Sequence, residues 1–240
     1  MAGKLLVIDF ETRSTLNLRK VGAWRYAADP ETDVLCACGV LGDGDVGTWV
    51  PGNPVPIPVI EAVADPNIVF VAHFATFEIA IWKHVLAPRH RWPEHPPAAR
   101  WRDTQAMALA AALPPRLDKV AKALSLKQQK ADDHVMHLTC KPRPRRGNED
   151  PAKGPYWYDD EKRLAELYEY CAQDVRCERE LFQWLPPLSP AEQKLWQLDQ
   201  TINERGFYTD GVLIEKAITL AAVAERAIQA ELRQVIGDAQ

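Results

Sequence analysis

The chain has 240 residues, of which 47% are hydrophobic and 26% charged, and its formal net charge is −4. This length suits one large domain, or one domain with part of another, and the composition supplies ample apolar material for a core. The negative charge excludes a protein that coats duplex nucleic acid by charge alone. It leaves room for a nuclease whose bound cations neutralise phosphate locally.

Membrane and export signals are missing from the sequence. No apolar stretch approaches the length of a membrane span, and the N-terminus lacks the apolar core and cleavage site of a signal peptide. Five oddly spaced cysteines fit reduced thiols better than a disulfide framework. We therefore expect a cytoplasmic protein with no membrane partner.

The first predicted strand lies in residues 4–14, KLLVIDFETRS. Its apolar run, Leu5 to Ile8, is typical of a strand that is buried on both faces in the middle of a sheet. Because side chains alternate along a strand, Asp9 and Glu11 project from the same face. Two such carboxylates repel each other, and a divalent cation with oxygen ligands would relieve the repulsion. The alternative is a strand that simply ends in polar surface residues, and D-x-E alone does not separate the two.

The remaining elements follow from apolar runs, helical spacing and turn residues. After a predicted loop at 15–33, we expect two strands at 34–41 and 46–50 that form a hairpin, and further strands at 68–72 and 100–103. Helices are predicted from the 73–78 segment to Leu86, and at 104–113, 116–125, about 160–185, 190–205 and 211–236. The order predicts an α/β sheet that begins antiparallel and continues parallel, with helices on its faces.

Three small motifs outside this pattern have structural explanations as well as functional ones. The glycines at 42, 44 and 47 match G-x-G-x-x-G, but no helix follows and two aspartates would repel a pyrophosphate, so we reject dinucleotide binding. Cys36 and Cys38 face the same way on a strand, as core residues or as a metal pair. His134, His137 and Cys140 share a helical face, but a fourth zinc ligand is not evident nearby.

A dense basic patch and an uncovered apolar stripe point to partners. The irregular stretch 139–155, which either grips a phosphate backbone or is a solvated loop, contains Lys141, Arg143, Arg145 and Arg146. The helix at 211–236 is strongly amphipathic and its apolar stripe has no obvious partner in the chain. We therefore expect that helix to pair with another copy or to fold back onto the preceding domain.

Three motifs stand in one order along the chain. They are D-x-E at Asp9 and Glu11, the pair Phe77-Glu78 after the fourth strand, and Y-x-x-x-D at Tyr170 and Asp174. Together they resemble the exonuclease motifs of the tyrosine-bearing, DnaQ-like branch of the DEDD superfamily of 3′–5′ exonucleases. The wider resemblance, through GAWRYAADPETDVL, RDTQAMALAAALPPRLDKVAKAL and YCAQDVRCERELF, is to the proofreading domain of phage-type family A DNA polymerases.

The resemblance implies a fold, a division into domains and an activity. The fold would be a ribonuclease H-like mixed sheet, with three antiparallel strands continued by parallel strands, flanked by helices and followed by a C-terminal helical segment. Residues 1–188 would form the exonuclease domain, and 189–240, with LDQTINERGFYTDGVLIEKA, resemble the truncated start of a polymerase domain. The activity would be a bacterial or phage-encoded, metal-dependent 3′–5′ exodeoxyribonuclease on single-stranded or frayed DNA ends, proofreading for a polymerase domain or subunit.

Residue roles are carried over on the matching positions. Asp9 would lie between two divalent cations, Mg²⁺ or Mn²⁺, with Asp174 and Glu11 on the first cation and Glu78 on the second. Tyr170 would orient the attacking water. Two cations ~3.5–4 Å apart lower the pKa of that water and neutralise the leaving oxygen. The implied substrate contacts come from four further positions and from the basic patch: Phe10, Thr12, Phe74, Phe77, Arg143, Arg145 and Arg146.

Two positions depart from the superfamily pattern. Glu78 stands where Asp is usual, and Phe74 stands where Asn is common. Phe74 cannot donate the hydrogen bond of an Asn, but its ring could stack on an unpaired base. These departures leave two alternatives open: a weakened module that only binds a primer terminus, and an RNA-trimming exoribonuclease with the same three motifs.

Overall fold

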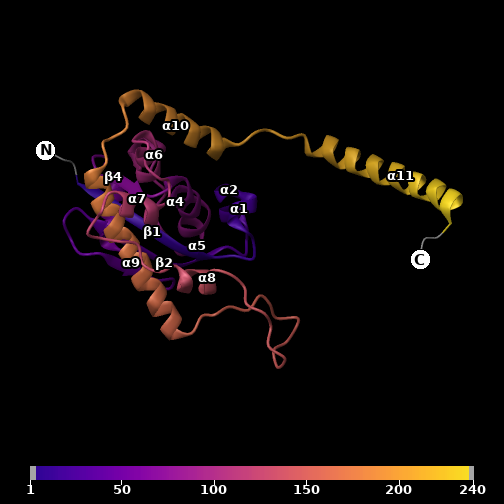
Figure 1. Ribbon diagram of the computed structural model, residues 1–240, viewed down its shortest axis with the longest axis horizontal. Helices are drawn as coiled ribbons and strands as arrows, with labels where there is room; N and C mark the ends of the chain where they lie inside the picture. Colours follow the sequence, from indigo (N-terminus) through magenta and orange to yellow (C-terminus); the bar gives the residue numbers. More distant parts are fainter. Residues whose placement is uncertain (1–3, 238–240) are drawn as a thin grey trace. The chain divides into compact units, whose positions relative to one another are not determined.

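The computed structural model describes residues 4–237 and divides into two units (Figure 1). The larger, compact unit ends at Glu204, and the smaller unit begins at Arg205. Each unit is described by itself below. No helix in residues 4–237 combines the length and the apolar character that crossing a lipid bilayer requires.

The compact unit is built on one mixed, five-stranded sheet. Its strands, in the sheet order β3-β2-β1-β4-β5, are Gly47–Trp49, Asp33–Leu41, Leu5–Arg13, Val69–Ala72 and Trp101–Asp103. The pairs β1–β2 and β2–β3 are antiparallel, whereas β1–β4 and β4–β5 are parallel. This topology confirms the predicted ribonuclease H-like sheet of three antiparallel strands continued by parallel ones.

Helices pack against the sheet in the compact unit, and a further helix belongs to the smaller unit. The sequence predicted six of the eleven α-helices in residues 4–237. Their bounds are α1 Leu18–Val21, α2 Ala23–Ala28, α3 Ile57–Ala64, α4 Ala75–Ile81, the π-helical turn Trp82–Leu86, α5 Ala87–His90, a 3₁₀ turn Ala98–Arg100, α6 Thr104–Ala110, α7 Leu117–Ala123, α8 His134–Thr139, α9 Glu161–Trp184, α10 Pro190–Arg205 and α11 Gly211–Ile236. The predicted loop at 15–33 is wrong, because α1 and α2 lie within it. Each spans only one or two turns, which is too short for helical periodicity to appear in the sequence.

The sheet has a different hydrophobic core on each face. Leu6, Ile8 and Phe10 of β1 pack toward α2, α3 and α4, whereas Val7 packs toward α9. The sheet therefore lies between α9 and the layer formed by α2, α3 and α4. Since Asp9 and Glu11 alternate with Phe10, both acidic side chains belong to the face that α9 covers.

A cluster of aromatic side chains anchors the helix that carries Glu78. Trp82 is fully buried, and its ring meets the edges or faces of Phe10, Phe70 and Trp92 with centroids 5.0–6.3 Å apart. Glu78 precedes Trp82 by four residues, so the two side chains share a face of the α4 helix and its π-helical extension. The packing of Trp82 therefore fixes the position of Glu78 against the sheet.

The last two helices belong to different surroundings. In the compact unit α10 is bound to the α4 region, because Thr76 Oγ1 donates to Gln200 Oε1 at 2.7 Å and Lys83 pairs with Glu204 at 2.7 Å. In the smaller unit Asp210 is the N-cap of α11, and its side chain accepts from the Leu213 N–H. The division into an exonuclease domain ending at residue 188 and the start of a polymerase domain stays a prediction.

Candidate active site

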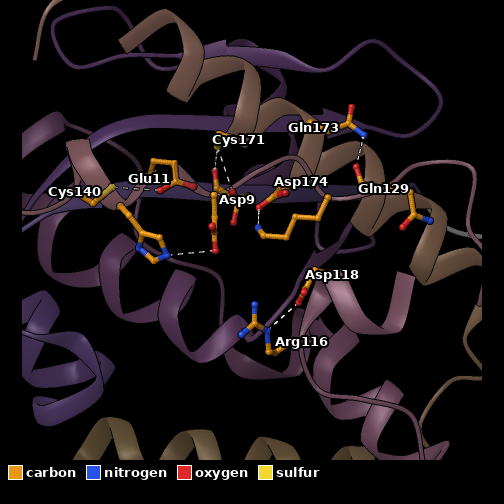
Figure 2. Close-up of polar contacts among 12 residues, drawn as sticks. Asp9, Glu11, Arg116, Asp118, Gln129, Cys140, Cys171, Gln173 and Asp174 are labelled. Atoms are coloured by element: carbon orange, nitrogen blue, oxygen red, sulfur yellow. Dashed lines mark hydrogen bonds and ion pairs between the residues drawn. The ribbon is translucent and has the colours of Figure 1, made fainter. Parts of the chain in front are cut away.

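Three carboxylates that are far apart in sequence lie close together between β1 and α9. One oxygen from each of Asp9, Glu11 and Asp174 lies within 4.8 Å of the others. Figure 2 shows Asp9 between Glu11 and Asp174, with the three side chains turned toward one another. Glu11 and Asp174 are only 8% and 4% exposed, and Asp9 is half-buried. The sheet and α9 thus bring residues 165 positions apart in sequence into one acidic group.

The helical repeat of α9 explains why its functional side chains converge. Cys171 and Asp174 are three residues apart, so both face β1. The Cys171 thiol donates to the Asp9 backbone carbonyl at 3.4 Å and to Asp9 Oδ2 at 3.3 Å (Figure 2). On the other side of the group, the Cys140 thiol donates to Glu11 Oε2 at 3.6 Å. These weak donors orient the carboxylates without neutralising them.

Burial and mutual repulsion make the charged state of this group unfavourable. Burial raises the pKa of Asp9 to about 7, and the negative charge of Asp174 adds to the effect. Burial, with the charges of Asp9 and Asp174, also holds the pKa of Glu11 well above its usual range. The pKa of Asp174 is raised by burial, although a nearby lysine opposes the shift. Compensation by cationic charge would remove this penalty.

Glu78 lies outside the 4.8 Å group, but the charge of Asp9 still affects its pKa. Its side chain is 2% exposed, and burial followed by the charge of Asp9 raises its pKa. Among the described residues, Glu78 Oε2 and Asp174 Oδ1 are buried with no hydrogen-bond partner. Buried carboxylate oxygens without a donor suit a hard cation such as Mg²⁺ or Mn²⁺, so the residues present fit the predicted metal site.

Glu178 is a fifth acidic side chain at this site and lies outside the three motifs. It follows Asp174 by four residues on the buried face of α9, is 2% exposed, and has no hydrogen-bond partner for Oε2 among the described residues. Burial raises its pKa well above its usual range, and the charges of Asp9 and Glu78 raise it further. Its four-residue spacing from Asp174 was a signal in the sequence.

Tyr170 lies on α9 one turn before Asp174, as predicted. Its side chain is 4% exposed and packs with Leu35 and Leu167. Burial and the negative charge of Asp174 raise the pKa of Tyr170 above its usual value. The hydroxyl therefore stays protonated at neutral pH and can donate or accept a hydrogen bond, but it cannot act as a general base there.

Lys130 is a cation at this site that was not predicted from the sequence. Its ammonium group contacts Asp174 Oδ2, and its Nζ lies 4.5 Å from the centroid of the Tyr170 ring. Burial disfavours the charged form of Lys130, but the Asp174 carboxylate outweighs it and raises the pKa of Lys130. The acidic group is therefore partly neutralised by the chain itself.

The β4–α4 turn carries a strained residue four positions before Glu78. Phe74 has φ 71° and ψ 52°, the left-handed region that non-glycine residues rarely adopt, and its side chain is 39% exposed. Its N–H donates to Asp103 Oδ1 at 3.0 Å, which holds the turn. Next to it, the two ring nitrogens of His73 meet Thr104 Oγ1 and the Pro115 carbonyl. Burial lowers the pKa of His73 to about 4. The neutral imidazole, with both ring nitrogens hydrogen-bonded, therefore holds the turn against Thr104 and Pro115.

Asp103 is expected to be important for stability. Its buried carboxylate caps α6 by accepting from the N–H groups of Gln105 and Ala106, besides that of Phe74. We expect Asp103→Ala to lower the free energy of unfolding by about 2 kcal/mol, because one change removes a cap and leaves buried donors unpaired. Urea unfolding measures this, with Asp118→Ala in the first turn of α7 as the matched control. A loss no larger than that of the control would contradict the capping role.

The predicted substrate contacts lie in different environments. Phe10 is 3% exposed and packs against Trp82 and Trp92 in the core, so its ring offers no face to a nucleotide. This prediction is corrected: the alternation that turns Asp9 toward α9 turns Phe10 the other way. Thr12 is buried and hydrogen-bonded to the Tyr26 hydroxyl at 2.9 Å. Phe77 is half-buried with its ring against Tyr26, and Phe74 alone of the four predicted contacts is exposed.

Within the basic patch, the arginines make hydrogen bonds to one acidic residue, Glu149. Arg143 makes a forked ion pair with Glu149, and Arg145 Nη1 donates to the Glu149 backbone carbonyl at 2.6 Å. The hydrogen bonds from Arg143 and from the Arg146 N–H lower the pKa of Glu149 to about 2. Arg143 thus stabilises the loop, whereas the guanidinium of Arg146 makes no hydrogen bond or ion pair among residues 4–237 and is exposed.

The cysteine and histidine patterns give one close group and one that does not form. Cys36, Cys38 and Cys171 are buried, with sulfur atoms within 4.8 Å of one another, between the sheet and α9. Cys140 instead contacts Glu11, and His137 pairs with Asp133 at 3.3 Å. In residues 4–237 the predicted set His134, His137 and Cys140 is not among the groups close enough to share a metal ion.

Comparison with known proteins adds a relative and several distant structures. No family model matches the chain. The DNA polymerase of Bacillus phage SP02 is 32% identical over 247 residues, which cover 98% of this chain and 36% of the relative. The chain therefore spans about a third of the length of that polymerase.

Among solved structures, the chain is similar to Brucella melitensis NrnC with bound Mg²⁺ (TM-score 0.49, 16% identity, 86% of this chain and 89% of that one). It is also similar to Escherichia coli RNase D, an exoribonuclease involved in structured RNA processing (TM-score 0.44, 14% identity, 82% and 45%). A third similarity is to a family B DNA polymerase of Pyrobaculum calidifontis (TM-score 0.47, 15% identity, 82% and 29%). Similarity at this level says nothing about activity.

Proposed function

We propose that the chain is a metal-dependent 3′–5′ exonuclease that hydrolyses phosphodiester bonds at single-stranded or frayed DNA ends. The observation that carries the proposal is the buried group of Asp9, Glu11 and Asp174, whose oxygens lie within 4.8 Å of one another. Burying three carboxylates together lowers the free energy of unfolding unless bound cations neutralise them. Strongly perturbed pKa values also cluster at functional sites. The Tyr170 hydroxyl beside it supplies a neutral hydrogen-bonding group.

Each acidic residue would have a separate role. Asp9, Glu11 and Asp174 would hold the first divalent cation, and Asp9 with Glu78 would hold the second, with Mg²⁺ or Mn²⁺ suited by the oxygen ligands. Bound cations would supply an acidified water and would neutralise the leaving oxygen. Glu178, buried behind Asp174 on the same helix face, would carry a proton and so keep the number of negative charges down.

Tyr170 would position the attacking water rather than remove its proton. Its raised pKa keeps the Tyr170 hydroxyl protonated, so the hydroxyl would only orient the attacking water. The bound cations would lower the pKa of that water. Glu11 would also contact the terminal 3′-hydroxyl. Phe74, exposed at the rim in a strained conformation, would stack on an unpaired base, since a ring face accepts any base.

The proposed setting is a DNA polymerase. The related phage protein is a DNA polymerase, and the present chain matches 36% of its length. We propose that residues 1–188 of the present chain are the proofreading domain of such a polymerase and that residues 189–240 begin its polymerase domain. The aliphatic side chains spaced along α11 would then be covered by that domain or by a second copy of the chain.

The test is the digestion of a 5′-labelled oligonucleotide by the purified chain. We expect stepwise shortening from the 3′ end with Mg²⁺ or Mn²⁺, release of nucleoside monophosphates, and complete inhibition by EDTA. A matched RNA oligonucleotide should be shortened more slowly. If the label stays at full length in both metals, the enzymatic proposal fails.

Two alternatives would give other results in the same experiment. A binding module for a primer terminus would retain the oligonucleotide without shortening it, and its binding would survive Asp174→Ala. An RNA-trimming enzyme would prefer the RNA oligonucleotide to the DNA one. The polymerase relative favours DNA.

A further inference from the structure

We infer that Lys130 is a built-in countercharge of the carboxylate group, which holds Asp174 in the absence of a divalent cation and competes with the cation for it. This inference rests on the proposed function and adds a residue that the three exonuclease motifs do not contain. It concerns the occupancy of the site, so it can be tested by metal binding as well as by nuclease activity.

The contacts of Lys130 are those of a site residue. Its ammonium group contacts Asp174 Oδ2, and its Nζ is 4.5 Å from the centre of the Tyr170 ring. The Lys130 side chain is 20% exposed and that of Asp174 is 5% exposed, so solvent screens the pair only weakly. A solvated surface lysine would show neither this burial nor these two partners.

The loop that carries Lys130 is tied to α9 at its start. Glu180, on the turn of α9 that follows the site, accepts from the Lys127 N–H at 3.0 Å and from the Gln128 N–H at 2.7 Å. One carboxylate thus receives two successive backbone donors. This arrangement fixes the direction in which the chain leaves Leu126 and enters the loop.

A second tie lies next to Lys130 itself. The Gln173 side-chain amide donates to the Gln129 carbonyl at 2.9 Å (Figure 2) and to Gln128 Oε1 at 3.1 Å. Gln173 and Asp174 are consecutive on α9, so the residue before Lys130 is bound beside the carboxylate that Lys130 meets. The structure therefore holds Lys130 in place through two backbone attachments, and the contact does not depend on the lysine side chain alone.

The chemistry of this arrangement is competition. An ammonium group is a single, compact positive charge, and it partly cancels the repulsion among Asp9, Glu11 and Asp174. A divalent cation bound to Asp174 carries the same sign and repels the ammonium, so the two cannot both keep their best positions. Without Lys130, the site would bind a cation more tightly and would be less stable when empty.

The experiment compares Lys130→Met with Lys127→Met in the whole 240-residue chain. Methionine keeps the approximate length of the side chain but removes its charge, and Lys127 is an exposed lysine of the same loop. Calorimetric titration with Mn²⁺ should give a dissociation constant at least about tenfold lower for Lys130→Met than for the wild type. Lys127→Met should bind Mn²⁺ like the wild type.

Thermal unfolding gives a second, independent readout. In EDTA, Lys130→Met should unfold at a lower temperature than the wild type, and saturating Mn²⁺ should raise its melting temperature by more than it raises that of the wild type. A lysine with a merely structural role would lower the melting temperature equally with and without Mn²⁺.

The outcomes separate this inference from the proposed function. If the wild type binds Mn²⁺ and shortens oligonucleotides, but Lys130→Met binds Mn²⁺ no more tightly, the countercharge role is overturned and the nuclease proposal stands. If the wild type neither binds Mn²⁺ nor shortens the oligonucleotide, the proposed function itself fails. Tighter Mn²⁺ binding by Lys130→Met, with no change in Lys127→Met, supports the inference.

Discussion

Asp9→Asn is expected to lower the rate of oligonucleotide shortening by about a thousandfold or more. Asp9 lies between Glu11 and Asp174 in the 4.8 Å group, and in the proposed mechanism it is the one ligand that both cations share. Loss of a shared anionic ligand removes several kcal/mol of transition-state stabilisation, and each 1.4 kcal/mol or so is a factor of about ten. Single-turnover rates at saturating Mg²⁺ measure the effect.

The substitution is chosen so that loss of activity is not confused with loss of folding. Asparagine keeps an oxygen that can accept from the Cys171 thiol, as Asp9 Oδ2 does. It also removes one of the charges that repel each other, so the variant should be at least as stable as the wild type in EDTA. Asp43→Asn, an exposed change in the β2–β3 turn, should leave the rate unchanged. Activity of Asp9→Asn within tenfold of wild type would contradict the assigned role.

The sheet could be predicted because it depends on strong local patterns, whereas the grouping of Asp9, Glu11, Glu78 and Asp174 was implied only by the family resemblance. The apolar run before Asp9 marks a central strand, and the long uninterrupted helix predicted at 160–185 is found at Glu161–Trp184. Strand alternation and helical spacing then decide which faces meet. The short helices α1 and α2 could not be predicted, because a helix of one or two turns leaves no periodic pattern.

The residues that were misassigned or missed at the site differ in how far the sequence could have placed them correctly. Phe10 could have been placed in the core from the same alternation that put Asp9 and Glu11 on one face. Glu178 could have been found from its four-residue spacing to Asp174. Lys130 could not, since it lies in a loop whose position depends on Gln173 and Glu180, and no sequence pattern reports such side-chain to backbone ties.

The second large effect should appear in Glu11→Gln, in the stability of the metal-free protein. Burial, with the charges of Asp9 and Asp174, raises the pKa of Glu11 above its unfolded value of 4.5. The folded state therefore binds the proton more tightly than the unfolded state. Stability from this group is fully present below pH 4.5 and is lost as the pH rises through the raised pKa. Glutamine does not titrate, so the variant escapes this loss.

In EDTA at pH 8, Glu11→Gln should therefore be more stable than the wild type by about 1–2 kcal/mol, or roughly 2–8 °C in melting temperature. This difference in stability should shrink toward pH 5. It should reverse with saturating Mg²⁺, because the variant has lost a metal ligand and the cation therefore stabilises the wild type more. Glu61→Gln, an exposed change on α3, should show none of these differences. If Glu11→Gln melts below the wild type in EDTA at pH 8, charge repulsion does not dominate this site. If Mg²⁺ does not change the melting temperature of the wild type, the proposal that the three buried carboxylates bind a divalent cation is contradicted.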